Sequence, residues 1–127
     1  MAKVTKSEIK NIETLSSVFG VNVVLVNKKI KVFPKNWAGT FISDTIYLNT
    51  LNKIDYLSVF FHELAHILCI RARKMKFFHN FNPSNETHQN IEKFNKILPK
   101  AEREIDIMAL KMMKTFFPKR KFYGYYL

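Results

Sequence analysis

The order of apolar and polar positions over the first third of the chain predicts a helix followed by two strands. Apolar residues recur at helical spacing over residues 5–19, between a capping box that begins at Thr5 and a helix stop signal at Gly20. The apolar, β-branched runs at residues 21–26 and 30–33 are typical of strands. We therefore expect a helix that packs on a small twisted sheet.

The next segment predicts a loop and a β-hairpin. The loop is expected over residues 34–40 and carries Trp37, the only tryptophan of the chain. Two short apolar runs, at residues 41–42 and 45–48, flank Ser43-Asp44, a pair typical of a tight turn. The hairpin would complete the small sheet.

Helical periodicity returns in the second half of the chain. Apolar residues at helical spacing predict a long helix over about residues 53–73. A loop is expected over residues 74–86, followed by a short helix over residues 87–96. Proline is common at the first position of a helix, so Pro99 is expected to open a last long helix that ends at about Phe117.

Together these elements indicate one α+β domain over residues 1–127, with a basic and aromatic tail at residues 118–127. Hydrophobic residues make up 47% of the chain, which is enough to build a core. A single cysteine, Cys69, excludes an intramolecular disulfide. The sequence has no apolar run long enough to span a membrane and no apolar signal region after Met1, so we expect a cytoplasmic protein.

The charge of the chain is strongly basic. Lysine and arginine number 21 against 10 acidic residues, which gives a formal net charge of +11. The densest basic patches lie at residues 71–76 and 119–121, and neither matches a known nucleic-acid-binding motif. This charge fits either a solvated basic surface or an anionic partner such as nucleic acid.

The segment His62-Glu63-Leu64-Ala65-His66 matches H-E-x-x-H, the signature of zinc metallopeptidases called zincins. Residues four apart lie on one face of a helix, so both imidazoles are able to reach one metal ion. Glu63 projects beside them and would take a proton from a water that the metal polarises. Five-residue patterns also arise by chance, but this helix is apolar on nearly all sides. Two buried histidines without a ligand would be poor choices there.

A catalytic zinc takes three protein ligands and a water, so one ligand is missing from this motif. Two acidic candidates, Glu102 and Glu104, border the apolar stripe of the last predicted helix, and their spacing does not decide between them. The other candidates downstream of the motif are His79, His88 and Cys69.

The segment E-R-E-I-D-I-M-A-L-K-M-M at residues 102–113 resembles part of the ImmA/IrrE-type metallopeptidases, which read roughly E-x-E-A-(N/D)-x-F-A-x-x-L-L. The resemblance spans about residues 41–113 and departs from the family pattern at Ile105 and Met108. It implies a minimal zincin-like domain with zinc bound by His62, His66 and Glu104. The layout is also similar to minimal gluzincins, whereas SprT-like proteins use a third histidine, a part that His79 could play.

The resemblance implies a zinc-dependent peptidase in which Glu63 activates the water. The expected partner is a protein or peptide substrate, such as a DNA-bound repressor of a phage or mobile element. The strand at residues 45–48 is expected at the edge of the cleft, where it would pair with an extended substrate. One of several side chains is expected to stabilise the oxyanion: His79, His88, Tyr123, Tyr125 or Tyr126.

Two other functions fit the residues. The protein could bind metal without turnover, as an inhibitor or antirepressor, or it could be a basic nucleic-acid-binding protein with a chance motif. The tail is expected either to pack on the core or to lie in the cleft or on a partner. If it blocks the site, deletion of residues 119–127 should raise proteolysis.

Overall fold

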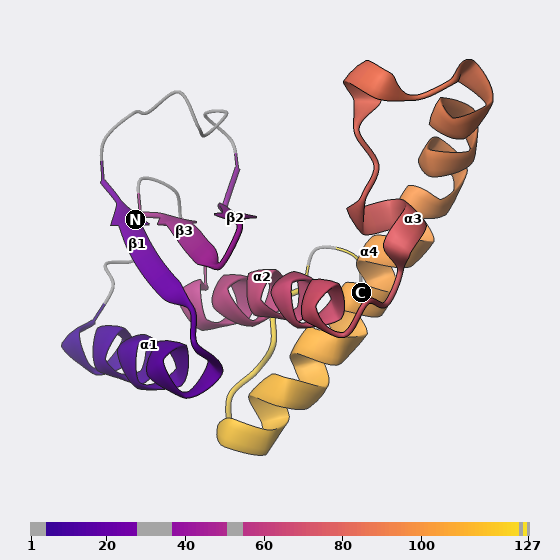
Figure 1. The fold of residues 1–127 in the computed structure, drawn as a ribbon. Helices are drawn as coiled ribbons and strands as arrows, with labels where there is room; N and C mark the ends of the chain where they lie inside the picture. Colours follow the sequence, from indigo (N-terminus) through magenta and orange to yellow (C-terminus); the bar gives the residue numbers. More distant parts are fainter. Residues whose placement is uncertain (1–4, 28–36, 51–54, 125, 127) are drawn as a thin grey trace.

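A computed structural model describes residues 5–27, 37–50, 55–124 and 126, and it has the expected α+β architecture (Figure 1). The elements in chain order are α1 (Lys6–Phe19), β1 (Asn22–Val26), β2 (Gly39–Ile42), β3 (Thr45–Asn49), α2 (Tyr56–Arg71), α3 (Lys76–His79), the 3-10 turn η1 (Pro83–Asn85) and α4 (His88–Phe116). No helix in these described ranges is both long enough and apolar enough to cross a membrane.

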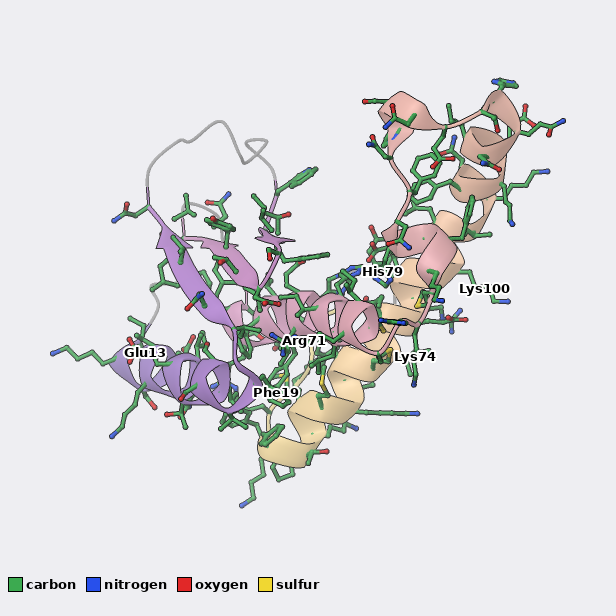
Figure 2. The ribbon with its side chains drawn as sticks, in the orientation of Figure 1. Glu13, Phe19, Arg71, Lys74, His79 and Lys100 are labelled. Carbon is green, nitrogen blue, oxygen red and sulfur yellow. The ribbon has the colours of Figure 1, made fainter. Side chains whose placement is uncertain are left out.

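Local signals at both ends of α1 act as the sequence predicted. The Thr5 side chain accepts a hydrogen bond from the Glu8 backbone N–H, and Gly20 ends the helix in the left-handed region at φ 65°. The Arg71 side chain, at the end of α2, then holds the end of α1 in place. Arg71 donates to the carbonyls of Phe19 and Gly20, so that the end of α1 lies against the end of α2 (Figure 2).

The described sheet has the strand order β1-β3-β2, with β3 parallel to β1 and antiparallel to β2. The predicted turn at Ser43-Asp44 is confirmed, with Ser43 at φ 54°. The predicted strand at residues 30–33 lies outside the described residues. The expectation that residues 45–48 form the cleft edge is wrong, because β3 is the central strand of the described sheet and β2 is its outer strand on the side of the cleft.

Helix α2 is the centre of the core. It contacts β2, β3, α1, α3 and α4, and almost every residue along it is buried. Its fully buried apolar side chains include Leu57, Phe60, Phe61 and Leu64. Burial on all sides explains why the helix is apolar all round rather than striped. The predicted helix at residues 53–73 is therefore confirmed in its centre, and it begins after Asp55, whose side chain caps the Ser58 N–H.

Helix α4 is continuous from His88 to Phe116, so the prediction of two separate helices is wrong. Pro99 lies inside it and removes the hydrogen bond to the carbonyl of Asn95, four residues earlier. Both residues are exposed, so water is able to hydrate the freed carbonyl. The cost of an internal proline is thereby reduced, and the apolar stripe continues through it.

The expected loop at residues 74–86 contains the single turn α3 and η1. Stacking stabilises this region where local propensity is weak: the ring of Phe94 on α4 lies 5.4 Å from that of Phe78 and 4.0 Å from that of Phe81. Figure 1 shows α3, η1 and the first turns of α4 as an arm that projects from the body of the molecule. The arm places α3 beside α2, at one side of the candidate site.

Candidate metal centre

Helix α2 presents the H-E-x-x-H residues from within the core. His62, Glu63 and His66 are all buried, with 7%, 9% and 5% of their surfaces exposed. The helical spacing brings the two imidazole rings to a centroid distance of 5.0 Å. Buried polar side chains need partners, and the partners of these histidines come from α4 and α3.

Glu102 on α4 faces both histidines. Its Oε2 lies 3.0 Å from Nε2 of His62 and 3.3 Å from Nε2 of His66. One ligand atom from each of the three side chains lies within 4.8 Å of the others. Tetrahedral ligands at about 2.0–2.1 Å from zinc lie about 3.3 Å apart, so these spacings and this His-His-Glu donor set fit a zinc ion.

Glu104, the predicted third ligand, lies on the wrong face of α4 to meet the two histidines. Glu104 is exposed and lines a different hollow with Met75, Phe77 and Lys100. Residues two apart point to nearly opposite sides of a helix, so Glu102 and Glu104 cannot both face α2. The resemblance aligned the family glutamate with Glu104, whereas the packing of α4 on α2 turns Glu102 inward.

Asp106 is a site residue that the sequence analysis missed. It is fully buried, and its Oδ1 lies 2.6 Å from Nδ1 of His62. The His62 Nδ1–H donates to this carboxylate, which leaves Nε2 directed at Glu102. The sequence did contain a signal for Asp106: it follows Glu102 by four residues and therefore lies on the same face of α4.

His79 on α3, labelled in Figure 2, contacts His66, with ring centroids 5.3 Å apart. Its Nε2 lies 3.0 Å from Nδ1 of His66, and its Nδ1 lies 3.3 Å from the Lys74 carbonyl. A consistent pattern has His66 donating to His79 and His79 donating to the carbonyl. Burial and the nearby His66 lower the pKa of His79, which favours the neutral ring that this pattern needs. His79 thus orients a candidate ligand and is not in the ligand group.

The structure separates the remaining candidates. His88 is exposed at the start of α4 and pairs with Glu92 at 3.0 Å, far along the arm from α2. Cys69 packs against Met108 at 3.5 Å. Tyr123 is exposed and Tyr125 lies outside the described residues, whereas Tyr126 lines the cleft described below.

Charges in the cluster stabilise a cation. Burial lowers the pKa of His62, but the hydrogen bond to Glu102, the charge of Glu63 and the hydrogen bond to Asp106 outweigh it and raise the pKa to about 9. Burial also raises the pKa of Glu102, yet the hydrogen bonds from His62 and His66 bring it to about 2. Without a metal, His62 is therefore an imidazolium between two carboxylates, and a metal ion would replace its proton.

Glu63 differs from the other two carboxylates. Burial raises its pKa, and the positive charge of the histidines opposes this only in part. A carboxylate with a raised pKa is a suitable general base near neutral pH.

An open cleft of about 470 Å³ leads to these residues. Residues 37–41, which include most of β2, line one side, and Phe78 and His79 on α3 line the other. His62, Glu63, His66 and Glu102 also line the cleft. Phe41 and Phe78 both stack with the ring of His66, at 5.3 and 6.0 Å.

Comparison with protein-family models, with curated proteins and with solved structures found no match to this chain.

Proposed function

We propose that this protein is a zinc-dependent metallopeptidase. The observation that carries the proposal is the convergence of His62, His66 and Glu102 in an open cleft, with Glu63 beside them. The resemblance to ImmA/IrrE-type enzymes and minimal gluzincins leads to the same class, with Glu102 in place of Glu104 as the third ligand. We further propose, from that resemblance and the net charge of +11, a DNA-bound regulatory protein as substrate.

Each residue has a distinct part in the proposed reaction. His62, His66 and Glu102 would hold the zinc, which when bound polarises the scissile carbonyl and acidifies a water. Glu63 would accept a proton from the attacking water and donate it to the leaving amine, a role that its raised pKa favours. Asp106 and His79 hold the two imidazoles through their Nδ1 atoms.

Strand β2 is the proposed support for the substrate. It is antiparallel to β3, and residues 39–41 line the cleft. An extended peptide that adds to the side of β2 away from β3, where no strand of the described residues pairs, would pass over Glu63 and the histidines. Phe41 and Phe78, which line opposite sides, suit a substrate with an apolar side chain near the scissile bond.

Two substitutions on α4 test the metal site. Zinc content should be measured by mass spectrometry on the wild type, Glu102→Ala and the matched control Glu104→Ala. We expect one zinc per chain in the wild type and in Glu104→Ala, and loss of zinc in Glu102→Ala. A wild type without zinc, after zinc has been supplied, would refute the proposal.

Substitution of Glu63 tests catalysis separately from metal binding. Cleavage of a quenched fluorescent peptide library should be followed for the wild type and Glu63→Gln. We expect Glu63→Gln to keep zinc and to lose peptidase activity by at least about 100-fold, because it removes the general base. Zinc binding without cleavage by the wild type would instead favour a metal-binding interaction module.

A further inference from the structure

The segment after α4 turns back to α2, the helix that carries the candidate metal ligands (Figure 1). Arg120 pairs with Asp55 at 3.6 Å, and the Tyr123 backbone N–H donates to Oγ of Ser58 at 3.0 Å. Both partners lie at the beginning of α2. The segment is therefore tied along the same helix that carries His62.

Asp106 connects this segment to His62. One carboxylate oxygen, Oδ1, accepts from His62, and the other, Oδ2, accepts from the backbone N–H of Tyr126 at 2.7 Å. Asp106 is fully buried, so each oxygen needs a donor from the protein. The Tyr126 N–H supplies one and thereby fixes the orientation of the carboxylate that His62 uses.

Gly124 lets the backbone approach Asp106 closely. A Cβ atom at this position would lie 2.8 Å from Oδ2 of Asp106 and 2.7 Å from Cε2 of Phe122. Any side chain there would have to displace the segment or the carboxylate. The ring of Tyr126 in turn stacks with that of His62, with centroids 6.3 Å apart and planes 20° from parallel.

We propose that residues 122–124 together with Tyr126 are a positioning element of the metal centre, in which the Tyr126 N–H orients Asp106 and Asp106 orients His62 for metal binding. This inference rests on the proposed metal site. It gives the segment a supporting role, in contrast to the sequence-based expectation that a segment in the cleft would block the enzyme. Loss of the segment should therefore weaken metal binding rather than release activity.

A pair of substitutions at one position isolates the backbone donor. Tyr126→Ala removes the ring and keeps the N–H, whereas Tyr126→Pro removes both. The dissociation constant for zinc should be measured by competition with a chromophoric chelator for the wild type, both variants and Gly124→Ala. Partners of metal ligands typically change metal affinity about 10–100-fold, so we expect Tyr126→Pro to bind zinc about 10-fold more weakly than Tyr126→Ala. Gly124→Ala should show a similar loss.

A second readout separates positioning from general folding. Circular dichroism should show that each variant is folded, and the ring ¹⁵N chemical shifts of His62 should move in Tyr126→Pro and Gly124→Ala. Equal zinc affinity for the Pro and Ala variants, with unchanged His62 shifts, would overturn the inference while leaving the proposed peptidase intact. Higher peptidase activity at unchanged zinc affinity would also overturn it and indicate a blocking segment. A wild type that binds no zinc would overturn both proposals.

Discussion

The protonated state of His62 predicts how the stability of the metal-free protein depends on pH. His62 has a pKa of about 9 in the folded protein and an ordinary value of 6.5 when unfolded. The folded state therefore binds the proton more tightly, and its added stability is fully present below pH 6.5 and is lost as pH rises through about 9.

The size of this effect follows from the two pKa values. Each pH unit between them corresponds to about 1.4 kcal/mol, so the interval from 6.5 to about 9 gives about 3–4 kcal/mol. His62 is only 7% exposed, so solvent screening reduces this figure little. The low pKa of Glu102 describes the same pair of charges and adds no separate contribution in this pH range.

Urea denaturation in the presence of a chelator, at several pH values from 6 to 9.5, measures the effect. The free energy of unfolding should fall with rising pH in the wild type and much less in His62→Gln. The difference between the two profiles removes the contribution of all other titrating groups. Glu102→Gln should also flatten the curve. A wild-type profile with the same slope as His62→Gln would refute the ion-pair reasoning.

Three further predictions follow from the site and the sheet. Zinc binding at pH 7.5 should release about one proton, because the ligand form of His62 is neutral; calorimetry in buffers of different ionisation enthalpy counts it. His79→Ala should weaken zinc binding about 10-fold, because His66 loses the acceptor for its Nδ1–H; chelator competition measures this, and unchanged affinity would contradict the assigned contact. Gly39→Ala should lower the free energy of unfolding by about 1–3 kcal/mol, because its Cβ would lie 2.6 Å from Cγ1 of Val59; urea denaturation measures this, and a neutral effect would argue against that packing.

The spacing of residues along the sequence was sufficient to predict the part of the site that lies on helix α2. The positions of His62, Glu63 and His66 follow from helical geometry alone, and their burial follows from the apolar residues around them. The ends of α1 were also predictable, because capping at Thr5 and the left-handed Gly20 depend on neighbouring residues only.

Features that depend on packing between elements distant in the sequence could not be predicted from local spacing. Glu102 and Glu104 both border the apolar stripe, and only the rotation of α4 on α2 selects Glu102. The hydrogen bond between His79 and His66 depends on α3, whose single turn is held by stacking with Phe94 on α4. Pro99 was read as a helix start because its exposure within a continuous helix is a property of the folded chain.

The nearly complete burial of α2 has a consequence for protein engineering. Truncation of a buried side chain on this helix, such as Phe60→Ala, would remove about 3–5 kcal/mol of stability, which is a large part of what a small domain has. New specificity is therefore better sought outside α2. Strand β2 and the one-turn helix α3 both line the cleft and are only partly buried, so substitutions there, outside Gly39 and His79, would alter the binding surface while the ligand-bearing helix keeps its packing.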